Sequence, residues 1–593
     1  MTTYKQDVKE LSRKEIWTRA VIKLTTQRDE QKILKTNAIR KLWNYSFNEI
    51  LVYRNPKPDV KILQAWEDFT NTSYGEKKPQ DLKIAFFCGP EPENDIDILI
   101  DLGVRVENIW AIEIDEENYN SALKTAKVKF PTLKIFNGDI ADLMQITSFK
   151  FDIVYLDFTA TLLTKKPASI HTINSIFENN SLADLGIMII NSALPNISDD
   201  SVDFLSSYFS SHSFLEESIY SGIDSDSHHV EGRMAHGYLT KRETEDGESS
   251  DDKIFEDIVR KNFSQAYSAF SSHYPFLFAS YLAPMVKVAN NGRLSKLFLE
   301  KNERIIKASI EKLSTQNEYT SDDAENECDG ISVEELIELL KKKPLIHEEK
   351  KSFYEIKNKE FISEDEENQE KEELYEGGEL YEDPENYPFW NFIDNIKSKE
   401  STACKFWYSE FTKNKNNKTS YLKCSQLYDL LRNGSYIYKA ILSPALSECI
   451  SEVQKSLPDR NGGVFCDVPM PHLWVELAVN HLGNSYHINT DQHWRAKYKA
   501  KEREMYLDMF TFDNCRPLYD WLPMLQMYGN DLKFIERQII IRSCMDLITK
   551  QSHYLSTGSY YGANLIDGYT DELFTFGNFS PRINLNKAEK NNF

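Results

Sequence analysis

The residues with the clearest capacity for chemistry are one glycine and three carboxylates, each at the end of an apolar run. Gly89 follows the run LKIAFFC. Glu113 lies in IWAIEI, Asp139 comes shortly after LKIF, and Asp157 comes directly after FDIVYL. A glycine turn lets the backbone approach a ligand closely, and carboxylates accept hydrogen bonds and protons. The pattern predicts a crevice in which a polar ligand meets several acids.

A parallel sheet would bring these residues together. Buried parallel strands are continuous apolar runs, and their alternation with helix-like stretches predicts right-handed crossovers and a doubly wound sheet. Such a sheet binds its ligand outside the carboxyl ends of its strands. The predicted strands span residues 82–88, 109–114, 133–136, 151–156 and 185–191. We expect a hairpin of two more strands, 214–221 and 232–241, to close the sheet, which gives seven strands.

Length and composition indicate a multidomain α/β protein. The chain has 593 residues, of which 41% are hydrophobic and 12% aromatic, enough for several packed cores. No apolar run is long enough for a membrane span, the first residues lack a secretory pattern, and the eight cysteines form no CxxC pair. We therefore expect a cytoplasmic protein without a membrane partner.

The chain divides into five expected regions. The sheet domain lies between a helical N-terminal region and a separate, mainly helical C-terminal region. In the N-terminal region, Ser12 to Glu15 have the form of a capping box, and Ile16, Ala20 and Leu24 follow at helical spacing. The regions are a basic helical region 1–75, the sheet domain 76–242, an acidic loop and helical region 243–354, an acidic linker 355–386, and an aromatic-rich domain of unknown type 387–593.

Charge is unevenly distributed along the chain, whose net charge is −23. Residues 1–61 carry 14 basic side chains against 7 acidic ones, whereas residues 363–386 carry 12 acids against one lysine. The overall field disfavours non-specific nucleic-acid binding. Nucleic acid is a candidate partner only for the basic N-terminal region, where Trp43 and Tyr45 could stack bases or simply anchor the region. A protein is the expected partner of the C-terminal region.

Five strand–helix units, a closing hairpin and this placement of acids resemble the class I S-adenosylmethionine-dependent methyltransferases, over roughly residues 76–242. The resemblance implies S-adenosylmethionine as cofactor. It implies that Cys88 and Gly89 form the turn beside the methionine part of the cofactor. It also implies that Glu113 accepts hydrogen bonds from the ribose and that Asp139 lies near the adenine. Asp157 takes the position that faces the substrate and is the candidate catalytic base.

The first turn departs from the family pattern. Glu91 stands where the last glycine of the motif is usually found, and a side chain there could fill space that the cofactor needs. Asp115 is the weaker alternative to Glu113. Acids near this turn would repel the pyrophosphate of a dinucleotide, which makes an NAD enzyme the poorer interpretation.

Two functions stay open. The first is a divergent methyltransferase that acts on a macromolecule, RNA or protein. Standard DNA base methylation is disfavoured, because Asp157-Phe158-Thr159-Ala160 lacks the prolines of the amino-methyltransferase tetrad. The second is a non-catalytic methyltransferase-like subunit that serves as a binding or scaffold component of a larger complex. A group of one cysteine and four histidines fits no common zinc spacing, so we expect no metal site: Cys466, His472, His481, His487 and His493.

Overall fold

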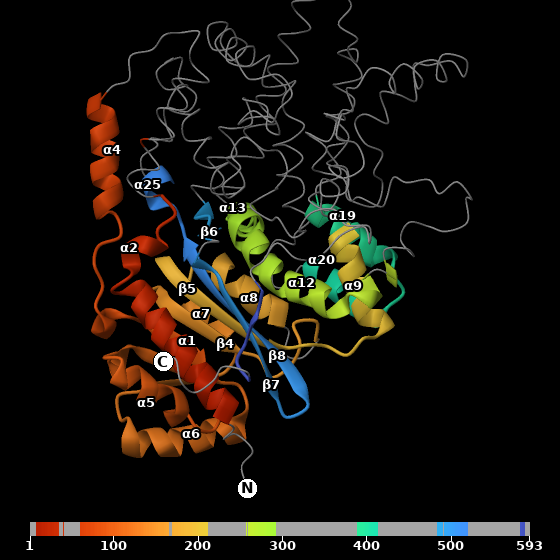
Figure 1. Ribbon diagram of the computed structural model, residues 1–593, viewed down its shortest axis with the longest axis horizontal. Helices are drawn as coiled ribbons and strands as arrows, with labels where there is room; N and C mark the ends of the chain where they lie inside the picture. The colour runs from red at the N-terminus through yellow and green to blue at the C-terminus, as the bar shows by residue number, and fades with distance from the viewer. Residues whose placement is uncertain are drawn as a thin grey trace, which may run out of the picture.

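One nine-stranded sheet organises the part of the molecule that is described, with helices on both of its faces (Figure 1). A computed structural model of the chain describes residues 7–34, 40, 60–164, 169–210, 256–257, 259–291, 388–412, 483–489, 492–519 and 581–586. Strands from the first and the last thirds of the chain lie side by side in this sheet.

Five parallel strands confirm the strands predicted from the apolar runs. Their order across the sheet is β3-β2-β1-β4-β5. Ile84 of the central strand pairs with Ile109 on one side and with Ile153 on the other. The strand order therefore reverses between β1 and β4, which is where doubly wound sheets bind ligands. The strands are β1 (Ile84–Phe87), β2 (Ile109–Glu113), β3 (Lys134–Asn137), β4 (Phe151–Asp157) and β5 (Leu182–Ala193).

Helices connect the parallel strands, and acids at the strand ends help to start them. Asp115 and Asp139 are N-caps whose carboxylates accept hydrogen bonds of 2.9 Å from the amides of Asn118 and Ala141. A capping carboxylate satisfies a free amide and interacts favourably with the helix dipole. The helices are α5 (Glu93–Asp101), α6 (Glu116–Lys129), α7 (Ile140–Ile146) and α8 (Ser169–Glu178), with short 3-10 turns η3 (Pro79–Asp81) and η4 (Val106–Asn108) before β1 and β2.

Antiparallel strands complete the sheet beyond β5. Leu185 of β5 lies opposite Asp513, and Ala193 lies opposite Met505, so the pairing covers most of the strand. The sheet has nine strands in the described residues rather than the seven expected. The added strands are β8 (Arg503–Asp513) next to β5, β7 (Trp494–Ala500) and β6 (His487–Ile488) antiparallel to β8, and β9 (Ile583–Asn584) parallel to β7.

The hairpin beside β5 does not come from the residues that we expected. Residues 214–221 and 232–241 lie outside the described part, whereas residues 494–513 provide an antiparallel hairpin at this edge. The expectation of a C-terminal region separate from the sheet was therefore wrong. A strand that pairs at a sheet edge does not have to be close to that edge in the sequence. The entropic cost of closing the loop between two paired strands grows only slowly with the length of the loop.

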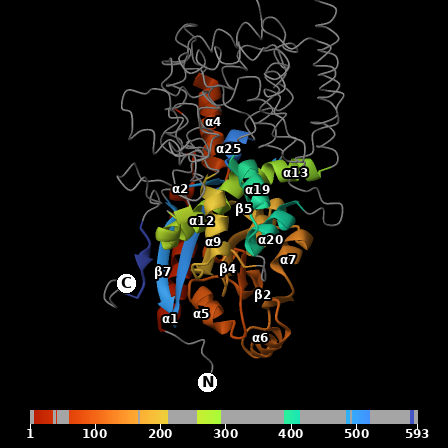
Figure 2. The same cartoon turned by 90° about the vertical axis from the view of Figure 1, so that its right-hand side faces the viewer.

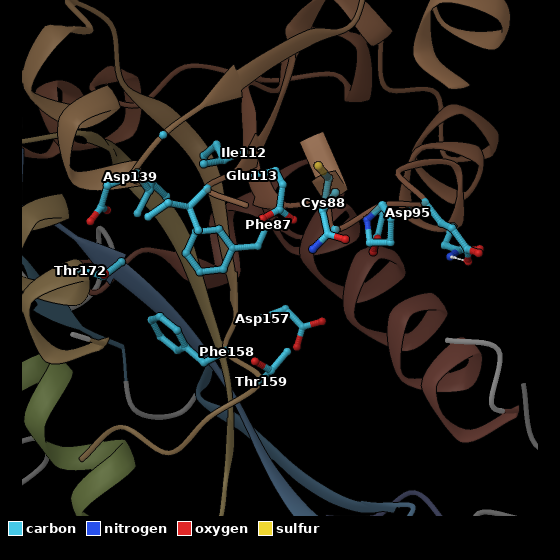
Figure 3. A pocket seen from close by; sticks show the side chains of 18 of the residues that line it. Phe87, Cys88, Asp95, Ile112, Glu113, Asp139, Asp157, Phe158, Thr159 and Thr172 are labelled. Carbon is cyan, nitrogen blue, oxygen red and sulfur yellow. Dashed lines mark hydrogen bonds between the residues drawn. The ribbon is translucent and has the colours of Figure 1, made fainter. Parts of the chain in front are cut away.

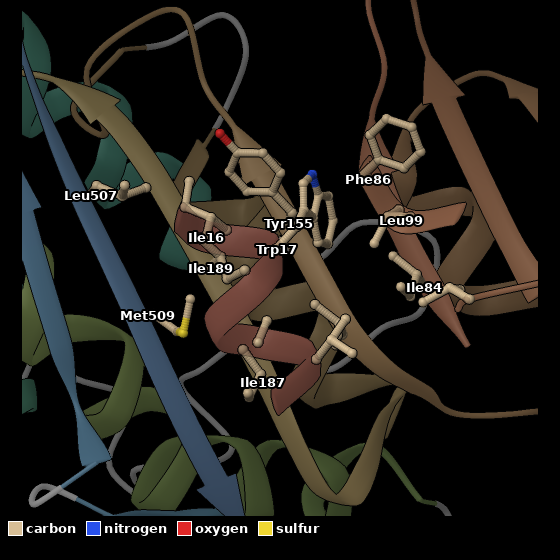
Figure 4. Close-up of a cluster of buried hydrophobic side chains, with 14 of the residues drawn as sticks. Ile16, Trp17, Ile84, Phe86, Leu99, Tyr155, Ile187, Ile189, Leu507 and Met509 are labelled. Atoms are coloured by element: carbon tan, nitrogen blue, oxygen red, sulfur yellow. The ribbon is translucent and has the colours of Figure 1, made fainter. Parts of the chain in front are cut away.

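Helix α1 (Asp7–Leu24) packs on one face of this sheet (Figure 4). Ile16, Ala20 and Leu24 are fully buried, which confirms the predicted apolar spacing. The Trp17 ring meets the Tyr155 ring of β4 edge-on, with 5.4 Å between centroids. Burying such a stripe contributes about 1.5–3 kcal/mol for each large side chain, so α1 is part of the sheet core.

The predicted start of that helix was wrong. Ser12 lies inside α1, where its hydroxyl donates to the carbonyl of Lys9 at 2.8 Å, and the helix begins at Asp7. A serine hydroxyl can bond the preceding turn of its own helix as readily as cap a new one. The Ser12–Glu15 pattern therefore could not distinguish the two positions.

The opposite face of the sheet is covered by helices from several parts of the chain. Phe177 of α8 packs edge-on against Phe512 of β8, with 4.9 Å between ring centroids. Helices expected at 171–180 and 201–211 are confirmed as α8 and α9. Figure 2 shows α19 and α20 beside α9. The helices are α9 (Asp199–Ser210), α12 (Phe263–Leu277), which continues through the π-helical segment η7 (Phe278–Leu282) into α13 (Ala283–Asn290), α19 (Pro388–Ser398) and α20 (Thr402–Thr412).

Three more helices lie toward the carboxyl-terminal end of β8. The Trp66 indole donates to the carbonyl of Pro517 at 2.8 Å, which joins α4 (Val60–Thr72) to α25 (Arg516–Tyr519). The short α2 (Arg28–Gln31) follows α1. No helix in the described ranges is long and apolar enough to cross a membrane. The expected helices at 332–343, 421–431, 473–482 and 532–547 and the acidic linker 355–386 lie outside these ranges.

Candidate functional site

A pocket of about 290 Å³ opens at the carboxyl ends of β1, β2, β3 and β4, where the strand order reverses (Figure 3). It is lined by all five residues predicted to form a site: Cys88, Gly89, Glu113, Asp139 and Asp157. The fold thus brings them together from four different strand ends. Their chemical roles stay predictions.

The turn after β1 leaves the pocket open. Gly89 has a φ of +58°, and a Cβ built on it would meet no atom within 4 Å. The Glu91 carboxylate also lines the pocket but accepts a hydrogen bond of 3.1 Å from the Asn94 side chain at the start of α5. The first turn of α5 thus holds the Glu91 side chain at the wall of the pocket, and the expectation that it takes space from the cofactor stays a prediction.

Glu113 and Asp139 lie at the β2–β3 side of the pocket. Oε1 of Glu113 accepts a hydrogen bond of 2.9 Å from the amide of Asp115. Burial raises the pKa of Glu113, and backbone hydrogen bonds from residues 114 and 115 oppose that shift. Oδ1 of Asp139 caps α7. Its Oδ2 has no hydrogen-bond partner among the described residues, so the structural role of this acid leaves one oxygen for a ligand. Asp115 caps α6 and does not line the pocket.

Asp157 is held in place by Asn191 on β5, which Tyr498 on β7 in turn contacts. The Asn191 side-chain amide on β5 donates to Oδ1 of Asp157 at 2.7 Å and to the hydroxyl of Tyr498 on β7 at 2.7 Å. The Phe158 amide donates to the Asn191 carbonyl at 2.9 Å. Tyr498 belongs to the late hairpin, so residues about 340 positions apart in the chain fix one carboxylate.

Two aromatic rings form an apolar wall of the pocket. Phe87 at the end of β1 meets Phe158 after β4 edge-on, with ring centroids 5.6 Å apart. In Figure 3 these rings lie between Asp139 and Asp157. An apolar wall with a few fixed polar groups is the usual make-up of a small-molecule site.

Sequence reasoning missed one group of site residues, which α1 supplies. Arg13 lines the pocket, and its Nε lies 3.5 Å from Oδ2 of Asp95. The Trp17 indole donates to Oδ1 of Asp95 at 2.8 Å. Burial raises the pKa of Asp95 to about 6, although Arg13 and Trp17 both oppose the shift. The only hint in the sequence was an arginine one turn from a buried tryptophan, which is too common a pattern to identify a site.

The histidines of the candidate metal group have other roles. His487 bonds the Tyr519 hydroxyl at 2.7 Å, and His493 lies 3.2 Å from the Asp508 carboxylate. No group of three or more potential metal-binding side chains occurs among the residues that the structure describes. Cys466, His472 and His481 lie outside them.

Comparisons with known proteins match only part of the fold. No protein-family model and no curated protein matches the sequence. Among solved structures, the chain is similar to the yhhF protein of Escherichia coli, described as a candidate methyltransferase. That match has 16% identity and a TM-score of 0.17, and it covers 24% of this chain and 76% of that one.

A second similar structure is an S-adenosylmethionine-dependent methyltransferase from Clostridium acetobutylicum ATCC 824. It has 16% identity and a TM-score of 0.16, and the match covers 26% of this chain and 57% of that one. These overlaps are too slight to carry an argument about activity. Evidence for a function comes instead from the strand order and the lining of the pocket.

Proposed function

We propose that this chain is a divergent S-adenosylmethionine-dependent methyltransferase that acts on a macromolecule, RNA or protein. The observation that supports this most is the pocket at the switch point of the sheet, with Gly89, Glu113, Asp139 and Asp157 on its walls. Five parallel strands followed by an antiparallel hairpin also agree with the family that the sequence resembles.

The lining suits this cofactor better than a phosphate-bearing one. When bound, S-adenosylmethionine supplies an electrophilic methyl group on a sulfonium centre. Glu113 and the second oxygen of Asp139 are proposed to accept hydrogen bonds from the ribose and the adenine. The open turn at Cys88 and Gly89 gives the backbone access to the rest of the molecule. The acids of the lining tolerate a cationic ligand and repel a pyrophosphate.

Asp157 is proposed to remove the proton from the accepting nitrogen or oxygen of the substrate. A general base must be fixed within reach of the proton that it takes. The hydrogen bond from Asn191 fixes one oxygen of Asp157 at the pocket wall. Holding the substrate group in line with the methyl donor would provide most of the remaining rate enhancement.

Calorimetric titration with S-adenosylmethionine and S-adenosylhomocysteine tests the proposal. We expect saturable micromolar binding that weakens about tenfold or more in Glu113→Ala and Asp139→Asn, since each loses a charged hydrogen-bond acceptor. Asp115→Asn is the matched control for Asp139→Asn. Both positions are helix N-caps that asparagine can also serve, but Asp115 does not line the pocket.

The alternative of a non-catalytic scaffold subunit predicts no saturable binding of either compound. That result from folded, intact protein would overturn the enzyme. If binding is found, transfer of a labelled methyl group to RNA and to protein fractions would then identify the substrate class.

A further inference from the structure

Among the described residues, Arg13 is the single positively charged side chain in a pocket lined by acids. Five carboxylates line the same walls: Glu91, Asp95, Glu113, Asp139 and Asp157. Arg13 comes from α1, outside the strand–helix units that supply the rest of the site. Its side chain is 14% exposed, so most of it is packed and its charged end is held at the pocket.

The surroundings of Arg13 hold one side of its guanidinium and leave the other side available. Nε lies 3.5 Å from Asp95, which is 4% exposed and also accepts the hydrogen bond from Trp17. Neither Nη atom has a hydrogen-bond partner in the described part of the chain. A guanidinium presents its donors as a planar fork that matches a carboxylate. The packing of α1 on the sheet therefore fixes a donor pair at the pocket.

We propose that Arg13 binds the carboxylate of an α-amino-acid group on the ligand, and that α1 is thus a functional part of the pocket. This inference rests on the proposed function, since the methyl donor carries such a group. The position of Arg13 agrees with it. Arg13 lies 3.5 Å from Asp95 and interacts electrostatically with Asp157 at the end of β4, whereas Glu113 and Asp139 lie at the β2–β3 side.

The charge balance favours a zwitterionic ligand tail over a phosphate. One arginine can neutralise one carboxylate, and the surplus of acids around it suits the accompanying ammonium group. A diphosphate would bring two negative charges to a site with one cation and five acids among its described lining residues. Arg13 therefore selects for a singly charged anion next to a cation.

Three ligands separate the parts of this proposal: S-adenosylhomocysteine, decarboxylated S-adenosylmethionine and 5′-methylthioadenosine. The last two lack the carboxylate. We expect Arg13→Gln to weaken S-adenosylhomocysteine about tenfold to a hundredfold in calorimetry, and to leave the affinity for the other two within about twofold. Arg13→Lys keeps the charge without the fork and should fall between the native protein and Arg13→Gln.

Lys14→Gln is the matched control, because Lys14 is the next residue on the same helix but is exposed and does not line the pocket. An equal loss for all three ligands in Arg13→Gln would show a merely structural role and overturn this inference while the proposed function stands. Unchanged affinity for S-adenosylhomocysteine would do the same. No binding of any ligand by the native protein would overturn both.

Discussion

Two regions of the sheet hold carboxylates in opposite ways: the face under α12, and the pocket at the carboxyl ends of β1 to β4. On the face under α12, Asp508 of β8 is 1% exposed and fully enclosed by donors. Arg582 lies 2.8 Å from it, Arg495 3.4 Å, His493 3.2 Å and the Ser272 hydroxyl 2.7 Å. At the pocket, the acids are more exposed and each uses only part of its hydrogen-bonding capacity on the protein.

This difference separates a structural acid from a ligand-binding one. Burial by itself would raise the pKa of Asp508, but Arg582, His493 and Arg495 outweigh it and hold that pKa well below its usual range. Burial raises the pKa of Glu113 at the pocket, where no cation of the described residues is placed against it. Asp95 lies between these cases, buried like Asp508 but with one arginine shared with the pocket. The acids of the site are therefore distinguished less by their burial than by carboxylate oxygens that protein donors leave available for hydrogen bonds.

The largest expected effect is at Asp508, the buried acid on the face under α12. Asp508→Asn would leave Arg495 and Arg582 buried without their counter-charge, since the side chains of both are about as buried as a core residue. We expect a loss of about 3–5 kcal/mol in the free energy of unfolding. Urea denaturation measures it. A loss below about 1 kcal/mol would mean that the paired acid is not what holds this face together.

The second-largest expected effect is a pH dependence of the free energy of unfolding that is due to Asp95. Its folded pKa of about 6 lies above the value of about 3.9 for an unfolded chain, so the folded protein retains a proton that the unfolded chain releases. The free energy of unfolding should thus fall by about 3 kcal/mol as the pH rises from about 3 to about 7.

Asp95→Asn has no proton to lose at this position and should lack that part of the decline. The measurement is the difference between native and Asp95→Asn unfolding free energies across this pH range and up to neutral pH. A difference that does not change with pH would contradict the raised pKa.

A smaller effect tests the open turn at the pocket. Gly89→Ala should cost about 1–2 kcal/mol, because its φ of +58° is unfavourable for alanine while no atom obstructs the new methyl group. Gly75, with a φ of +60° and equally open space, does not line the pocket and is the matched control. Both variants should lose similar stability in thermal unfolding. Only Gly89→Ala should also weaken the binding of S-adenosylhomocysteine. Equal affinities of the two variants for this compound would show that the turn at Gly89 does not contact the ligand.

The smallest stability change is expected at Asp157. Asp157→Asn keeps an oxygen for the Asn191 amide and leaves no buried cation unpaired among the described residues, so the free energy of unfolding should change by less than about 0.5 kcal/mol. The same substitution at Asp508 should cost several times more. Comparable losses at the two positions, measured in one urea series, would contradict the distinction between the pocket and the face under α12.

Local patterns were enough to predict the parallel half of the sheet. Continuous apolar runs such as FDIVYL are typical of buried parallel strands, and the polar residue that ends or succeeds each run marks its carboxyl end. The positions of Glu113, Asp139 and Asp157 at one pocket could be inferred from that pattern alone. The closing strands could not be assigned, because the edge of β5 accepts any strand with suitable alternation. We expected the nearer residues 214–221 and 232–241 at this edge, where residues 494–513 lie.

By itself, the sequence determined which segments form β1 to β5 and which acids lie at their ends, because strand burial and turn chemistry are local. Only the tertiary structure decided that α1 brings Arg13 to the pocket and that Tyr498 supports Asp157 through Asn191. Those contacts join residues far apart in the chain. They depend on which surfaces pack together. The apolar stripe of α1 or of β8 predicts that it is buried, but the hydrophobic effect is non-directional and does not determine which surface covers it.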